Sequence, residues 1–230
     1  MTDVIGYILL GASAAIPLLL RWHWGVCFPT GCDVRPDPRV VPVRAWNLVR
    51  GILASGCFVL VISHLFLYGP RVVGTFTVLT LLLLGSYLVA ASFGPNNLAV
   101  SMLHILLPCA FVVVVGYWAL VAPRDMRRSR WTTYIGHGAN AAVAYIDFWV
   151  SRAHLDARYC AIVGSAWCAL FVPLALLVYV CTGHWPYPFM DESNPLLPLA
   201  VLGLDVAVAL GVCVAYGLAQ LKKHRRAKKE

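Results

Sequence analysis

The chain has 230 residues, of which 60% are hydrophobic and only 12% are charged, and its formal net charge is +8. Soluble domains are typically about a quarter charged, so this composition excludes an ordinary water-soluble fold. The mean hydropathy is +0.77. Together with several apolar runs of about 18 residues or more, it predicts an integral membrane protein with several spanning helices.

Seven apolar segments predict about seven transmembrane helices, so the expected fold class is all-α, a polytopic membrane helical bundle. The segments are continuous rather than alternating in polarity, which argues against the strands of a membrane barrel. Short loops connect them, and we therefore expect a single domain over residues 1–230. In chain order the segments cover residues 4–20, 46–68, 72–93, 98–121, 131–150, 159–181 and 196–221.

The first segment, residues 4–20, follows an acidic start and has no persuasive cleavage site, so we expect it to remain as a helix. The loop after it contains His23, Cys27 and Cys32. Their spacing is irregular for a zinc site and no fourth ligand is obvious. We therefore predict neither a metal ion nor another cofactor.

Lys and Arg are unevenly divided between the two faces of the expected bundle. The loops after the first and fifth segments, together with residues 222–230, carry more of them than the opposite loops. By the positive-inside rule, we expect a cytoplasmic C-terminus and an N-terminus that lies outside the cell or in a lumen. The compartment stays open between the endoplasmic reticulum, another endomembrane and the plasma membrane.

Residues 222–230 form a basic cytoplasmic tail with six Lys and Arg residues. Such a tail beside a spanning helix contacts anionic lipid or anchors the topology more often than it binds nucleic acid. Its end loosely resembles a dibasic retrieval signal to the endoplasmic reticulum. We expect membrane lipids as partners and no nucleic acid, and the sequence names no protein partner.

Polar residues inside the expected spans are informative because lipid disfavours them, so they usually face a bundle interior or a cavity. A structural hydrogen bond between helices is the alternative role for each. The set is His64, Thr77, Thr80, His104, His137, Asn140, Asp147 and Asp205.

Depth along the helices separates these residues. Thr77 and His137 lie six residues beyond Arg71 and Trp131, which mark the outer ends of their segments, so both are about 9 Å below the same boundary. Asn140 follows His137 by three residues and shares its helix face. His64 lies near the outer end of its own segment. A hydroxyl, two imidazoles and an amide are therefore expected to converge in one leaflet.

This combination of groups indicates ester hydrolysis. An imidazole can take the proton of a threonine hydroxyl as the oxygen attacks an ester carbonyl, and an amide can orient the imidazole or donate to the oxyanion. The catalytic candidates are Thr77, His137 and Asn140, and the substrate would be a lipid ester.

Two motifs resemble the androgen-induced and androgen-dependent TFPI-regulating protein family. Residues 136–143, Gly-His-Gly-Ala-Asn-Ala-Ala-Val, resemble that family's Asn-His-Gly-x-His-Thr-Thr-Val run. Residues 182–190, Thr-Gly-His-Trp-Pro-Tyr-Pro-Phe-Met, resemble its Thr-Gly-x-Trp-x-Tyr-Pro-Phe-Leu between the last two helices. The family-like region covers residues 46–221 and leaves the first helix as an addition.

The resemblance implies a multi-pass hydrolase of fatty acid esters of hydroxy fatty acids, with an intramembrane threonine nucleophile and a histidine partner. Thr77 matches the threonine. The position that matches the family's catalytic histidine is Asn140, and an amide cannot act as a general base. His137 matches the family's other histidine, one turn earlier, and is the expected substitute.

Two hypotheses from different classes remain open. One is a lipid-ester hydrolase that uses Thr77, His137 and Asn140, and the other is a non-catalytic relative that binds lipid or forms part of a membrane assembly. A transporter is a third reading, suggested by Asp147 and Asp205, but no inverted repeat supports it.

The loop over residues 183–194 combines aromatic residues with prolines, which predicts a stiff apolar lid over the outer mouth of the bundle. An interfacial aromatic anchor is the alternative. For a lid, the expected substrate-binding residues are Trp185, Tyr187 and Phe189, joined by His64 from the second segment.

The topology is directly testable. A glycosylation acceptor sequence added at the N-terminus should be glycosylated in microsomal membranes, and one added at the C-terminus should not, because an odd number of spans separates the termini. Modification at both ends, or at neither, would contradict seven spans.

Overall fold

A computed structural model of the chain describes residues 33–94, 97–118, 131–187, 190 and 197–228. The expected first helix at residues 4–20 lies outside this part of the chain. So do His23, Cys27 and Cys32 of the following loop, and Phe189 of the aromatic loop.

All regular elements of the described residues are helical, which confirms the expected all-α class. In chain order they are α2 (Val43–Tyr68), the short 3-10 helix η1 (Pro70–Gly74), α3 (Phe76–Ser92), α4 (Asn97–Gly116), α6 (Trp131–Val150), α7 (Ala157–Thr182) and α8 (Leu197–Ala227).

Four of the described helices are long and apolar enough to cross a membrane, judged by length and composition: α2, α4, α7 and residues Leu202–Ala227 of α8. Helix α3 is apolar but has only 17 residues. Helix α6, with 20 residues, is not among the four, and its sequence includes His137, Asn140 and Asp147. The chain therefore has the helices of an integral membrane protein, but the expected count of seven spans is not confirmed.

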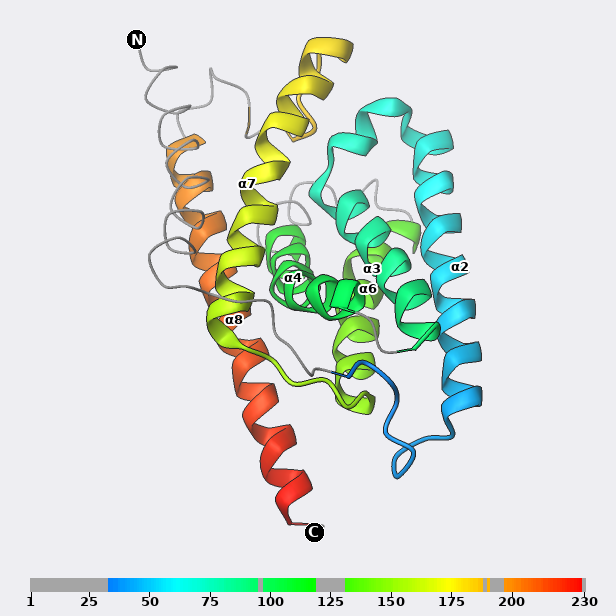
Figure 1. The fold of residues 1–230 in the computed structure, drawn as a ribbon. Helices are drawn as coiled ribbons and strands as arrows, with labels where there is room; N and C mark the ends of the chain where they lie inside the picture. Colours follow the sequence, from blue (N-terminus) through cyan, green and yellow to red (C-terminus); the bar gives the residue numbers. More distant parts are fainter. Residues whose placement is uncertain (1–32, 95–96, 119–130, 188–189, 191–196, 229–230) are drawn as a thin grey trace.

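Helix α4 occupies the centre of the bundle and contacts α3, α6, α7 and α8 (Figure 1). Glycines let α7 and α8 approach it at Pro108. A Cβ on Gly211 of α8 would lie 2.8 Å from the Pro108 carbonyl oxygen, and one on Gly164 of α7 would lie 3.0 Å from Pro108 Cγ. Close backbone approach through small residues is how helices pack tightly in lipid.

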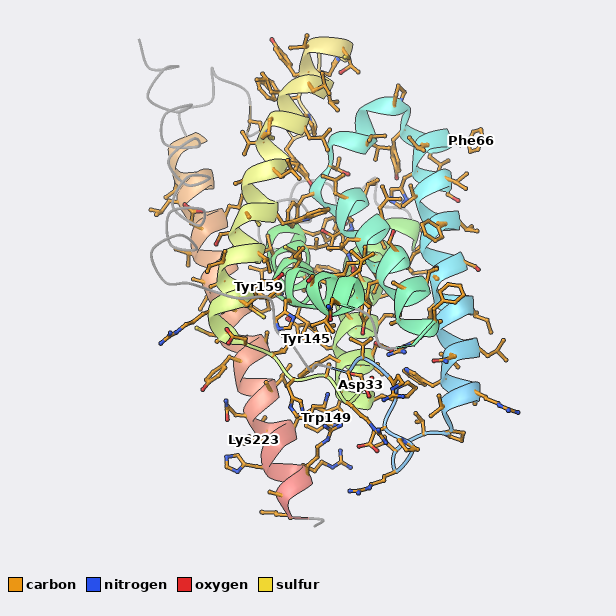
Figure 2. The ribbon with its side chains drawn as sticks, in the orientation of Figure 1. Asp33, Phe66, Tyr145, Trp149, Tyr159 and Lys223 are labelled. Atoms are coloured by element: carbon orange, nitrogen blue, oxygen red, sulfur yellow. The ribbon has the colours of Figure 1, made fainter. Side chains whose placement is uncertain are left out.

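Helix α2 lies at the periphery beside α3. Its Phe66 points away from the bundle (Figure 2) and is 87% exposed. An outward apolar side chain on a helix of this composition is suited to lipid contact. At one end of the bundle, the upper end in Figure 1, the end of α2, the start of α3 and the end of α7 lie together.

Helix α3 begins later than the sequence predicts. The expected span starts at residue 72, but residues 70–74 form η1, and Thr75 has an extended backbone and caps α3 with its hydroxyl, which accepts a hydrogen bond from Val78 N. Proline at the start of η1 and a threonine cap both favour a break here. As a result Thr77 lies in the first turn of α3, closer to the helix end than the depth count placed it.

Helix α8 continues past the expected boundary at residue 221. The ammonium group of Lys222 donates to the carbonyl oxygens of Phe148 and Ala153, and Arg226 donates to the Ser151 carbonyl and pairs with Asp37 at 3.2 Å. The end of α6 leaves carbonyl groups without helical partners, and cations are stabilised there. The first part of the expected basic tail is therefore a docked helix end.

A buried ion pair and its hydrogen-bond partners join three helices near the start of α2 and the ends of α3 and α6, which lie at the lower end of the bundle in Figure 1. Arg50 of α2 is 0% exposed, and its guanidinium donates to both carboxylate oxygens of Asp147 of α6, at 2.7 and 3.0 Å. Tyr87 of α3 and Trp46 of α2 also donate to this carboxylate, at 2.5 and 2.8 Å.

Two further N–H groups of Arg50 donate to the main-chain carbonyls of Val34 and Ala91. Both charges are thus fully paired, which is the condition under which buried charges are tolerated. Asp147 was expected among the interior polar residues, whereas Arg50 was not singled out. No transport role follows for Asp147, because its oxygens are taken up by structural partners.

Removing one partner of the ion pair should destabilise the bundle strongly. Arg50→Ala leaves the Asp147 carboxylate buried without its cation, and we expect a loss of about 3–5 kcal/mol in the free energy of unfolding. Thermal unfolding in detergent or nanodiscs would measure it. Arg44→Ala, an exposed arginine on the same helix, is the control and should change stability by less than about 0.5 kcal/mol. Equal effects of the two variants would contradict a central role for the pair.

Candidate functional site

Thr77 and His137 meet where the first turn of α3 lies against the first half of α6. Thr77 Oγ1 lies 3.0 Å from His137 Nε2, a hydrogen-bonding distance between α3 and α6. Thr77 is buried and His137 is partly exposed. Because Thr77 sits in the first turn of α3, its side chain leaves the helix next to main-chain N–H groups that have no acceptor within the helix.

Tyr117 stacks on the imidazole of His137 and restricts the orientation of this ring. The two rings stack with centroids 3.7 Å apart and an interplanar angle of 24°. Tyr117 is buried and follows directly after α4, so the central helix positions the ring. Sequence reasoning missed Tyr117. The available signal was its place near the outer end of the fourth expected segment, at a depth comparable with His137.

The aromatic loop reaches the same place from the other side. The hydroxyl of Tyr187 accepts a hydrogen bond from Phe76 N at 3.1 Å, and it also interacts with the side chain and main chain of Thr77. Burial raises the pKa of the Tyr187 hydroxyl, while its hydrogen bonds to Thr77 and the α3 backbone act in the opposite direction. The net direction is upward, so the hydroxyl keeps its proton at neutral pH.

The loop around Tyr187 packs against the bundle. Trp185 stacks on Tyr179 of α7 with ring centroids 4.3 Å apart, and Met190 is buried and donates its N–H to the Tyr187 carbonyl. These contacts agree with the expectation that the loop folds over this end of the bundle.

Asn140 is buried near this pair but does not join it. The residue is 1% exposed, and neither its amide nitrogen nor its amide oxygen has a hydrogen-bond partner among the described residues. Buried polar groups without partners are uncommon in proteins. Asn140 lies three residues from His137 on α6, so an amide with free donors and a free acceptor is close to the site.

His64 lies against α6 beside the pair rather than within it. Its Nδ1 is 2.7 Å from the Leu60 carbonyl oxygen of its own helix. Its Nε2 and Cε1 are 3.9 and 3.8 Å from where a Cβ of Gly136 would be, an ordinary van der Waals distance, so the ring lies against α6 at Gly136. The expected substrate-binding role of His64 therefore stays a prediction.

The other interior polar residues lie elsewhere or bond within their own helices. His104 is buried, and its Nε2 accepts the main-chain N–H of Asp156 at 3.2 Å near the start of α7. Thr80 donates to the Phe76 carbonyl one turn back. Asp205 is exposed on α8. In the described parts of the chain, no group of three or more His, Cys, Asp or Glu residues is placed to hold a metal ion.

Comparisons of the whole chain with family models, with curated proteins and with solved structures find no match. The described residues form a bundle of apolar helices with a threonine–histidine pair near one end.

The fit of the loop over α3 can be tested at Gly74. A Cβ at this position would lie 2.8 Å from Pro186 Cγ and 2.9 Å from Val178 Cγ2. Gly74→Ala should therefore displace the loop, with a cost of about 1–3 kcal/mol. Hydrogen exchange at the start of α3 should accelerate, because Phe76 N–H loses its acceptor.

Gly56→Ala on α2 is the matched control, since a Cβ there meets nothing within 4 Å. It should leave exchange at α3 unchanged. Unchanged exchange in Gly74→Ala as well would show that the loop does not depend on this contact.

Proposed function

We propose that this protein is an intramembrane lipid-ester hydrolase with Thr77 as the nucleophile and His137 as the general base. The observation that carries the proposal is the 3.0 Å separation of Thr77 Oγ1 and His137 Nε2, within the range of about 2.6–3.2 Å for a base that removes a proton directly. The proposal also agrees with the resemblance of residues 136–143 and 182–190 to the androgen-induced and androgen-dependent TFPI-regulating protein family.

Neutral His137, with its ring proton on Nδ1, accepts the Thr77 proton at Nε2 while Oγ1 attacks the ester carbonyl. The imidazolium then returns this proton to the leaving alkoxide as the carbon–oxygen bond breaks, which leaves an acyl group on Thr77. Water, activated by the same imidazole, releases the fatty acid. Asn140, whose amide is unpaired, is the candidate to orient the imidazole or to donate to the oxyanion.

The substrate class follows from where the pair lies. Thr77 is surrounded by the apolar residues of α3, and the aromatic loop adds Trp185 and Tyr187 at the same end of the bundle. A lipid ester that enters from the bilayer can place its chains against such surfaces. The family resemblance points to fatty acid esters of hydroxy fatty acids in particular. The proposed site faces the outer leaflet, with a cytoplasmic C-terminus.

The proposal is tested with a fluorophosphonate probe, which reacts with activated hydroxyl nucleophiles. The purified protein in nanodiscs should be labelled and should hydrolyse a fatty acid ester of a hydroxy fatty acid. Thr77→Ala should abolish labelling and lower kcat/KM by about 10³-fold or more, and His137→Gln should lower it by about 10²–10⁴-fold.

Thr80→Ala is the matched control, because this hydroxyl lies about one turn further along α3 and donates to the Phe76 carbonyl of its own helix. It should keep both labelling and turnover. Wild-type protein that is folded yet neither labelled nor active would favour the second candidate, a non-catalytic lipid-binding relative. The unpaired amide of Asn140, at the position of the family's catalytic histidine, is the feature that favours that candidate.

A further inference from the structure

We propose that Tyr187 is a catalytic residue of this reaction, whose hydroxyl donates a hydrogen bond to the oxyanion that forms when Thr77 attacks the ester carbonyl. The proposal rests on the proposed hydrolase function of Thr77 and His137. It assigns chemistry to the loop between α7 and α8, which then supplies a donor from outside the two helices that hold the nucleophile and the base.

The hydrogen bond to α3 restricts the direction of the Tyr187 proton. Because the hydroxyl oxygen accepts from Phe76 N, its own proton points away from that N–H group. The neighbouring polar group is Thr77, with which the hydroxyl also interacts. In these contacts the Tyr187 oxygen is the acceptor, since they favour its deprotonated form. Its proton therefore points away from them, beside Thr77, where the carbonyl oxygen of a bound ester would become the oxyanion.

The surroundings favour a neutral donor at this point. The pKa of Tyr187 is raised by burial, so the hydroxyl remains protonated when the oxyanion develops. The first turn of α3 adds the positive end of a helix dipole beside the developing negative charge. Groups that are fixed before the charge forms stabilise it without reorganisation, which is the usual source of large electrostatic effects in catalysis.

With this assignment, atoms and electrons balance in the acylation of Thr77 by the ester. A bond forms between Thr77 Oγ1 and the carbonyl carbon, the Thr77 proton moves to His137 Nε2, and the carbonyl π electrons move onto oxygen. Tyr187 donates a hydrogen bond to that oxygen but keeps its proton. When the tetrahedral intermediate collapses, the ester C–O bond breaks, and the leaving alkoxide takes the proton from His137.

Packing holds the Tyr187 ring in the required place. Its ring lies 6.1 Å from that of Phe171 on α7, and Phe171 in turn packs edge-on against Phe76 with centroids 5.5 Å apart. On either side of Tyr187, Trp185 is stacked on α7 and Met190 is buried. A donor supported on both sides meets the geometric demand of an oxyanion site.

The experiment compares steady-state kinetics of the nanodisc-embedded protein with the same lipid ester. Tyr187→Phe keeps the ring and removes only the hydroxyl, and kcat should fall by about 10²–10³-fold, the usual effect of losing one oxyanion donor. KM should change by less than about threefold. Tyr145→Phe is the control, because its hydroxyl bonds to the Leu107 carbonyl on α4, and its kcat should match that of the wild type.

A tyrosine fluorinated beside the hydroxyl, introduced at position 187, is a second variant that restores a stronger donor without changing the fold. It should recover kcat to at least the wild-type value. A purely structural role predicts instead that thermal stability and KM change while kcat does not, and this result overturns the proposal. Full activity of folded Tyr187→Phe overturns it too.

Two outcomes distinguish failure of the proposed function from failure of the Tyr187 role. If wild-type protein has no Thr77-dependent activity, the proposed function fails and the role of Tyr187 fails with it. If hydrolysis requires Thr77 and His137 but is unaffected by the Tyr187→Phe change, only the role of Tyr187 is overturned.

Discussion

The buried pair of Arg50 and Asp147 is the interaction on which the rest of the bundle depends. Both charges lie where water does not reach, and each is tolerated only because the other is present. Through this pair and its partners, α2, α3, α6 and the segment before α2 meet at one point. Hydrogen bonds between a guanidinium and a carboxylate depend on direction. They therefore fix the rotation of each helix about its own axis as well as its position.

Helix α6 connects this ion pair to the candidate site. His137 and Asp147 are ten residues apart on the same helix, so about 15 Å of rigid helix connects the ion pair to the imidazole. Tyr87 and Thr77 are related in the same way on α3. The separation of Thr77 and His137 is therefore set by helices anchored at their far ends, which is the type of support that a site needs for precise geometry.

The sequence predicted much of this arrangement because helices have a fixed rise. The apolar segments located six of the described helices, and depth along two of them brought Thr77 and His137 to one level. Periodicity could not reveal that Arg50 finds Asp147 across 97 positions of sequence, or that Tyr117 and Tyr187 close around the pair. Such contacts depend on tertiary packing, which a single sequence does not display.

Two helix boundaries differ from the prediction for local reasons. Helix α3 starts later than predicted, because the threonine cap at Thr75 outweighs the continuous hydrophobicity of the segment. Helix α8 ends later than predicted, because its cations bind main-chain carbonyl groups near the end of α6.

The docking of α8 also bears on the order in which the protein can fold. Lys222 and Arg226 donate to carbonyl groups at and just after the end of α6, which precede them by 69 to 75 positions, and Arg226 reaches back 189 positions to Asp37. During synthesis, the carbonyl groups near the end of α6 lack these cationic donors until α8 has emerged from the ribosome. Contacts of such long range close large loops and form late in folding. Until then α6, which carries the histidine of the candidate site, can pack against α3 and α4, but the carbonyl groups at its C-terminal end lack the cations of α8.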